Sequence, residues 1–140
     1  MLFKSIAACA LMAATLVSAP ARAAGEFPYD RVLLLDVPAM KPLKRVPILK
    51  VGDDGMATIE LWCRTANARV QVTDNAIRIE TAPLSAALPQ YMSSGQCSDD
   101  RVQADNVLLE EIVQVTEWRA RGDSIELIGP KPMRFRAATH

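Results

Sequence analysis

The sequence contains few residues that could support catalysis near neutral pH. Its only histidine is His140, at the end of the sequence, so a Ser–His–Asp or Cys–His mechanism would have to recruit a terminal residue. No glycine-rich phosphate-binding loop occurs among the six glycines. The carboxylate pairs Asp53–Asp54 and Asp99–Asp100 could act as acid and base, but a turn and a helix start explain them more simply. We therefore expect no enzymatic activity.

The cysteines favour a covalent cross-link. Cys9 falls in a segment that we expect to be removed, which leaves the even pair Cys63 and Cys97. An even pair in an exported chain favours a disulfide, and this one would close a loop of about 35 residues worth roughly 4 kcal/mol. The alternative, a metal site, is poor because no histidine or third cysteine is at hand. We expect a Cys63–Cys97 disulfide and no metal or other cofactor.

Residues 1–23 have the parts of a secretory signal peptide. A basic residue near the start is followed by an apolar run over residues 5–17 and by the small-x-small cleavage site Ala21-Arg22-Ala23. The run is shorter than the ~20 residues that a membrane-spanning helix needs. A lipoprotein is disfavoured because its modified cysteine follows the apolar run, whereas Cys9 lies inside it. We expect a periplasmic or secreted protein, cleaved after Ala23, with no transmembrane segment.

Length and charge limit the classes of partner. The whole chain has 140 residues with 16 basic and 16 acidic ones, and removal of 23 residues leaves 117, which suits a single domain. Lys4 and Arg22 leave with the signal peptide, so the mature chain has 14 basic and 16 acidic residues, a net charge of −2. A nucleic-acid partner would need a basic face, so none is expected. No run of Lys or Arg marks an anionic membrane surface.

The remaining chain is dominated by strand patterns. Residues 24–44 form a proline-rich N-terminal segment, in which the apolar residues 32–35 can lie at a sheet edge or against the core. Beyond it, alternating apolar and polar residues and turn signals predict strands at 46–51, 56–62, 69–73, 76–81, 115–119, 124–128 and 133–136. We expect an α+β domain over residues 45–140. Its mostly antiparallel strands, about seven, would form a curled sheet or open barrel packed on one α-helix.

One helix is expected over about residues 99–114, with Ser98 as its N-cap. The face expected to contact the core carries residues that recur at helical spacing: Val102, Asn106, Leu109, Ile112 and Val113. Residues 82–96 have no sustained period and contain turn-forming residues. We expect this segment to be an irregular loop.

The candidate binding residues are apolar or aromatic. Leu88, Tyr91 and Met92 fall in the predicted loop, where they would either form an exposed apolar patch or anchor the loop to the core. Trp62, next to the first mature cysteine, would stack on the disulfide or line the mouth of the barrel. Trp118 lies on a strand and is expected to be half-buried rather than a platform for a ligand.

Several stretches resemble the META domain, the HslJ-like family of exported bacterial proteins linked to heat-shock and stress phenotypes: Gly55–Cys63, the hairpin to Ile79-Glu80-Thr81, Gln96-Cys97, Val115–Arg119 and Gly122–Ile128. The resemblance covers about residues 45–136. It implies a curled antiparallel sheet with one helix and a stress-associated role. The family usually has a glycine-bearing loop after its first cysteine, and here Thr65–Ala68 contains no glycine. A family-typical surface at those positions is therefore not expected.

These observations favour a non-enzymatic periplasmic or envelope module, associated with stress, that presents the 82–96 loop to a protein or envelope partner. The alternative is a carrier that holds a small apolar ligand in the barrel. A tight apolar cavity between sheet and helix would favour the carrier, and a fully packed core would count against it.

Overall fold

The computed structural model of the chain describes residues 14, 26–38 and 45–139. The predicted signal peptide, Ala14 apart, and His140 lie outside the described residues. The helices α1 (Pro89–Ser93) and α2 (Asp99–Val113) lie between β5 and β6 in the chain. The strands are β1 (Leu33–Leu35), β2 (Ile48–Val51), β3 (Met56–Glu60), β4 (Thr65–Thr73), β5 (Ala76–Thr81), β6 (Glu117–Arg121), β7 (Ser124–Ile128) and β8 (Met133–Ala137).

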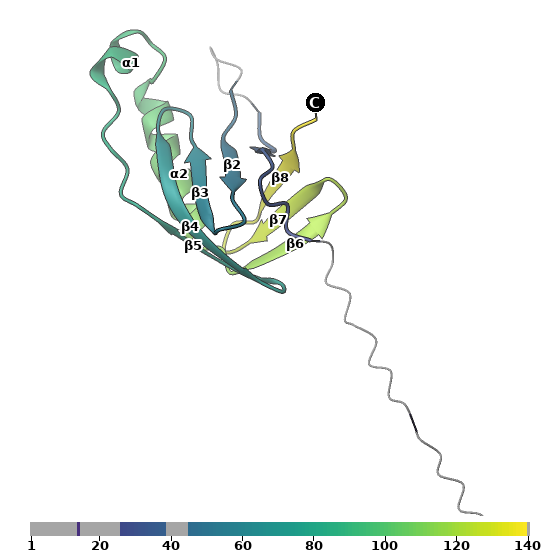
Figure 1. Ribbon diagram of the computed structural model, residues 1–140. Coiled ribbons are helices and arrows are strands. Elements are labelled where there is room, and N and C mark those ends of the chain that lie inside the picture. The colour runs from purple at the N-terminus through teal and green to yellow at the C-terminus, as the bar shows by residue number, and fades with distance from the viewer. Residues whose placement is uncertain (1–13, 15–25, 39–44, 140) are drawn as a thin grey trace, which may run out of the picture.

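The strands form a closed antiparallel barrel, in which each strand pairs with the next and β1 pairs with β8 (Figure 1). The predicted class, a mostly antiparallel α+β domain with one main helix against the barrel, is confirmed. The barrel has eight strands and is closed rather than open. The additional strand is β1, in which Leu33 pairs with Ala137 and Leu35 with Phe135.

The barrel therefore begins before residue 45, the residue at which the sequence pattern predicts the start of the domain. Phe27 and the two inward-facing leucines of β1, Leu33 and Leu35, belong to the same buried cluster as the later strands. A three-residue strand is too short to show a period of its own. Its closing role follows only from its pairing with both β2 and β8.

Two tight turns set the register of the hairpins. Between β4 and β5, Thr73 pairs with Ala76, and Asp74 occupies the left-handed region with φ 40°. Between β2 and β3, Gly55 has φ 83°, and a Cβ there would lie 2.9 Å from the carbonyl oxygen of Val70. Gly55 is thus required by both its backbone angle and the close approach of β4. Asp53 and Asp54 belong to this turn, as the sequence suggested.

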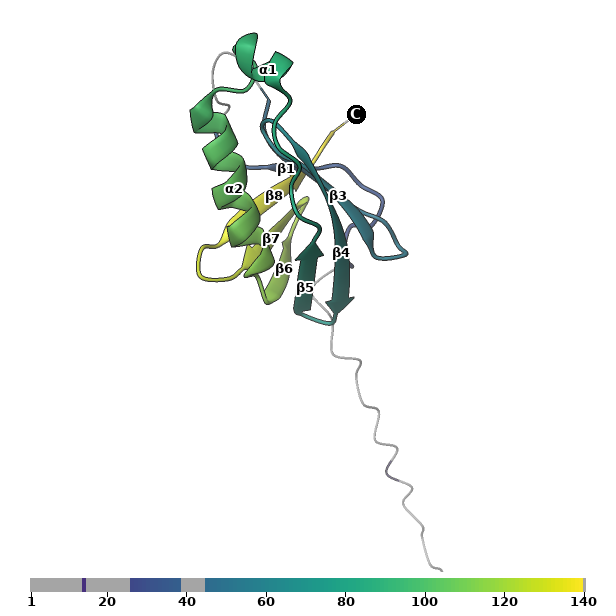
Figure 2. The same ribbon diagram turned by 90° about the vertical axis from the view of Figure 1, so that its left-hand side faces the viewer.

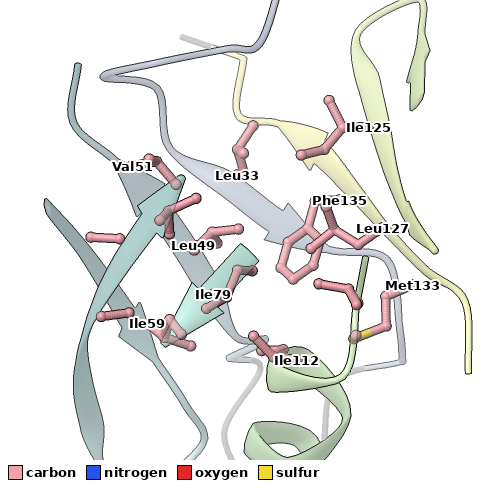
Figure 3. Packing of buried hydrophobic residues seen from close by; sticks show 14 of the residues in the cluster. Leu33, Leu49, Val51, Ile59, Ile79, Ile112, Ile125, Leu127, Met133 and Phe135 are labelled. Atoms are coloured by element: carbon pink, nitrogen blue, oxygen red, sulfur yellow. The ribbon is translucent and has the colours of Figure 1, made fainter. Parts of the chain in front are cut away.

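The interior of the barrel is filled by side chains from all of its sides (Figure 3). Leu33, Leu49, Leu127 and Phe135 are at most 1% exposed, and Ile112 of α2 points into the same cluster. Burial of each such side chain stabilises the fold by about 2 kcal/mol. Outward-facing residues alternate with these on every strand, as the sequence pattern predicts.

Helix α2 packs against the barrel through a face that differs from the predicted one. Ser98 caps its start as expected, its side chain accepting a hydrogen bond from the backbone N–H of Arg101. The prediction that Val113 contacts the core is wrong, because its side chain is 41% exposed. The buried residues of the helix are Arg101, Asp105, Leu108 and Ile112. Their spacing of four, three and four residues places them on one stripe.

The segment 82–96 is not entirely irregular, because it contains the short helix α1. Pro89 occupies the first turn, where its missing N–H costs no hydrogen bond. Figure 2 shows α1 beyond the N-terminal end of α2. Leu88 and Met92 are 50% and 40% exposed. Most of the segment therefore projects from the barrel.

Candidate functional site

The fold brings the two mature cysteines together. Cys63 follows β3, Cys97 immediately precedes the N-cap of α2, and the thiol of Cys63 is hydrogen-bonded to Cys97. Both are free thiols in this structure, so the predicted partners are adjacent but are not joined in the predicted disulfide. Cys97 is buried, whereas Cys63 is partly exposed.

The surroundings of Cys63 disfavour its thiolate. Burial, the hydrogen bond with Cys97 and the nearby carboxylate of Asp105 raise the pKa of the Cys63 thiol to about 12, and the positive charge of Arg101 opposes them. The thiolate is the nucleophilic form of cysteine, so Cys63 is a poor nucleophile at neutral pH. The pair suits a structural cross-link better than catalysis.

Beside the cysteines, Asp105 holds the chain after β3 against α2. Its side chain is fully buried. It accepts hydrogen bonds from the backbone N–H of Trp62 at 2.8 Å and from that of Cys63 at 3.2 Å, and an ion-paired bond from Nε of Arg64 at 3.2 Å. Burial raises the pKa of Asp105, and the Arg64 guanidinium and these backbone donors oppose the rise.

Two arginines complete this network. Besides its bond to Asp105, Arg64 donates to Oδ1 of Asn106 at 2.7 Å and to the carbonyl oxygen of Val102 at 3.0 Å. Arg101, which is 2% exposed, donates to the carbonyl oxygen of Gln96 at 2.7 Å. The segments that carry both cysteines are thus fixed to α2 by buried, charge-assisted hydrogen bonds.

The sequence patterns did not identify Arg64, Arg101 and Asp105 as members of a site. One signal was present: Arg101 and Asp105 share the stripe of Leu108 and Ile112. Charged residues at core positions of a helix are almost always paired. The predicted core face instead contained Asn106 and Val113 and omitted Arg101 and Asp105.

Next to this network, a groove of about 440 Å³ runs between α2 and the adjacent ends of β1 and β8. Its apolar lining comes from both sides: Leu35, Val37, Trp62, Ala104, Val107, Leu108, Pro132 and Met133. Charged residues border it, among them Glu111 and Lys131, which form an ion pair at 3.3 Å. Val107 and Val37 are 42% and 36% exposed, so apolar surface is open to solvent in the groove.

The predicted binding residues do not form one site. Trp62 lines the groove, beside the cysteine pair. Trp118 is 5% exposed and packs edge-on against Phe27 at 5.2 Å, so it belongs to the core and not to a surface. Leu88 and Met92 are exposed on the α1 segment and do not line the groove. The side chain of Tyr91 lies outside the described residues.

The described residues contain no group of three or more His, Cys, Asp or Glu side chains that could hold a metal ion. Within the same ranges, neither helix has the length and apolar character needed to cross a membrane.

The fold and the site define a small antiparallel β-barrel with one long helix packed against it and an apolar groove beside that helix. No known family model matches the chain, and no curated protein matches it. The fold is similar to that of an uncharacterised Escherichia coli protein solved by NMR, with a TM-score of 0.49. The two are 13% identical, and the match covers 76% of this chain and 88% of the other.

Proposed function

We propose that the mature chain is a non-enzymatic interaction module of the bacterial envelope and that its binding site is the groove between α2 and the adjacent ends of β1 and β8. The observation that carries the proposal is the groove itself, a concave surface of about 440 Å³ with a mostly apolar lining. Ligand and partner sites are typically concave and apolar with a few polar groups at fixed places. The stress-associated role rests on the resemblance to the META domain.

The groove is a better site than the interior of the barrel. The interior is occupied by large side chains such as Phe135 and Leu127, which are at most 1% exposed. A ligand inside the barrel would have to displace this packed core. The groove needs no such displacement, because Val37 and Val107 already expose apolar surface there.

The occupant that fits best is an apolar segment of a partner protein. The groove has an apolar centre around Trp62 and Leu108 and a charged border that includes Glu111 and Lys131. An apolar centre with a polar rim is the usual anatomy of a protein–protein interface. The α1 segment, with Leu88 and Met92 exposed, would be a second contact surface.

We also propose that Cys63 and Cys97 form a disulfide after export. Their adjacency in the fold supports this, because oxidation would join two side chains that already touch. The periplasm is an oxidising compartment in which such pairs persist as disulfides.

A photo-cross-linking residue placed at position 107 tests the groove. Val107 and Val113 lie on the same helix with almost equal exposure, 42% and 41%, but only Val107 lines the groove. We expect a cross-linked partner from living cells with the probe at 107 and not at 113. Cross-links at 113 alone, or at both positions equally, would contradict the proposal.

The same groove also supports the second candidate, a carrier of a small apolar ligand. Its volume lies in the range of small-molecule sites. Native mass spectrometry of the periplasmic protein would then show a bound small molecule that is lost in Val107→Lys and kept in Val113→Lys. A stable complex with a protein, lost in the same variant, would favour the interaction module.

A further inference from the structure

The outer face of strands β6, β7 and β8 gathers four arginines. Arg119 and Arg121 lie two residues apart on β6, Arg134 and Arg136 lie two residues apart on β8, and all four are exposed. Because side chains of a strand alternate between faces, a spacing of two places both members of each pair outside the barrel. We call this surface the arginine face.

The register places the arginines in two rows across β7. Arg119 and Arg134 are both opposite Glu126, and Arg121 and Arg136 are both opposite Ser124. With strands about 4.8 Å apart, the two arginines of a row are separated by about 10 Å at their Cα atoms. The four guanidinium groups therefore cover one continuous surface.

Most of this charge is not neutralised within the described part of the chain. Glu126 forms an ion pair with Arg121 at 3.3 Å. Among the described residues, Arg119, Arg134 and Arg136 have no carboxylate within 4.0 Å. Three guanidinium groups on a protein of nearly neutral composition are thus available to an anionic partner.

Other acidic residues border the face without pairing with it. Asp36 continues β1 beside Arg134, Asp123 lies in the turn between β6 and β7, and Glu117 begins β6. The guanidinium of an arginine stands at the end of a long stem, farther from the sheet than an aspartate carboxylate. Beside Asp36 and Asp123, the outermost charges of the face are therefore positive.

Apolar surface adjoins one end of the arginine face. Tyr29 and Val32 are 37% and 39% exposed. Tyr29 and Arg31 share a hollow with Ser124, and the carbonyl oxygen of Val32 accepts a hydrogen bond from the N–H of Ala138. Arginines next to an exposed tyrosine match the boundary between lipid headgroups and acyl chains.

We propose that the arginine face binds the phosphate groups of an anionic lipid surface. The three available guanidinium groups, spread over a broad sheet face, can contact several phosphates at once, as a membrane presents them, whereas one free ion could reach only one or two. Guanidinium groups bind phosphate through paired hydrogen bonds. The sequence does not reveal this surface, because its arginines alternate with inward-facing residues on separate strands and form no run.

The test is co-sedimentation of the mature protein with vesicles at low salt. Phosphatidylcholine vesicles are compared with vesicles of phosphatidylcholine and phosphatidylglycerol, and Arg119→Gln/Arg136→Gln is compared with Arg69→Gln/Arg78→Gln. Both variants remove two positive charges from exposed positions, but Arg69 and Arg78 lie on β4 and β5. Arg134 is left intact because it borders the groove, so groove cross-linking at position 107 remains an independent measurement.

We expect binding only to the anionic vesicles and weaker binding at high salt. Each arginine near an anionic surface contributes about fivefold, so the face variant should bind about 25-fold more weakly and the control variant within about threefold of wild type. Glu126→Gln releases Arg121 from its ion pair and should strengthen binding about fivefold.

Four results would overturn the proposal. The first is equal binding to both kinds of vesicle, or no binding to either, and the second is an equal loss in the two double variants, which would indicate an effect of net charge alone. The third is complete release by inorganic phosphate at the same phosphate concentration, which would indicate a site for a single small anion. The fourth is a preference for a poly-glutamate peptide over vesicles that depends on the arginine face, which would indicate an acidic protein partner.

Discussion

Oxidation of the cysteine pair should raise the stability of the mature protein without changing its fold. The backbone around both cysteines is already fixed by Asp105, Arg64 and Arg101 when the thiols are free. A disulfide between Cys63 and Cys97 therefore acts mainly on the unfolded chain, whose freedom it restricts. The folded reduced and oxidised proteins should have the same secondary structure by circular dichroism.

The size of the effect follows from the length of the loop. A cross-link that closes about 35 residues stabilises a protein by about 4 kcal/mol, which for a domain of this size raises the melting temperature by about 15 °C. The double variant Cys63→Ser/Cys97→Ser is the matched control. Its melting temperature should not change when a reductant is added.

The redox state itself must be measured on the unfolded chain. With a pKa of about 12, the Cys63 thiol is ionised to only about one part in ten thousand at pH 8, so in the folded reduced protein this thiol should alkylate about a thousandfold more slowly than an ordinary one. The other thiol, Cys97, is buried. Native labelling thus fails to separate a buried thiol from a disulfide. Unfolding in guanidinium with iodoacetamide and no reductant, followed by intact mass, separates them.

The pH dependence of stability gives a second measure of the redox state of the cysteine pair. The pKa of Cys63 is raised from 9.0 to about 12 in the folded protein, so the thiol favours folding below pH 9 and this contribution is lost as the pH rises towards 12. The reduced protein should lose stability over that range, and the oxidised protein should not show this loss. If periplasmic protein takes up two alkyl groups in guanidinium without reduction, the disulfide proposal is refuted.

Three further predictions concern the packing, two of them with a matched control variant. Asp105→Asn leaves the Arg64 guanidinium without its carboxylate and should lower the free energy of unfolding by about 3 kcal/mol in a denaturant titration, whereas Asp123→Asn in an exposed turn should change it by less than about 0.5 kcal/mol. Ile112→Asp should prevent stable folding, because the Ile112 side chain is 0% exposed. Val113→Asp should melt within about 2 °C of wild type, because the Val113 side chain is 41% exposed. Equal effects of the two substitutions would refute the assigned helix face. Replacement of Leu88–Ser94 by a Gly/Ser linker should leave the melting temperature nearly unchanged, and unfolding would show that this segment belongs to the core.

The sequence predicts most of the barrel because its strands form hairpins in which apolar and polar residues alternate strictly. In the β4–β5 hairpin, Val70 pairs with Ile79 and Val72 with Ile77, as alternation around a two-residue turn requires. The closure of the barrel was not predictable in this way. It depends on β1, whose three residues carry no period and whose partner β8 lies about a hundred residues away in the chain.

The candidate site was less predictable than the fold. The adjacency of Cys63 and Cys97 could be predicted because they form an even pair of cysteines. The groove could not be predicted in this way, because it depends on the orientation of α2 about its axis against the barrel. That orientation is set by Arg101 and Asp105, which occupy core positions because each finds partners there. Hydrophobic periodicity does not identify core positions that are occupied by a buried ion pair. The periodicity therefore predicted that Val113 contacts the core, whereas Val113 is exposed in the structure.

This network also separates the binding site from the redox state of the cysteines. Asp105 accepts hydrogen bonds from the backbone N–H groups of Trp62 and Cys63, at 2.8 and 3.2 Å, and these bonds do not depend on a bond between the sulfur atoms. The position of Trp62 in the wall of the groove is thus fixed by a carboxylate on α2, and Leu108 in the opposite wall belongs to the same helix. Reduction removes a restraint on the unfolded chain, whereas loss of the Asp105 carboxylate removes the contact that positions the groove. A disulfide would therefore affect the free energy of unfolding, and Asp105 the position of the groove walls that a partner would contact.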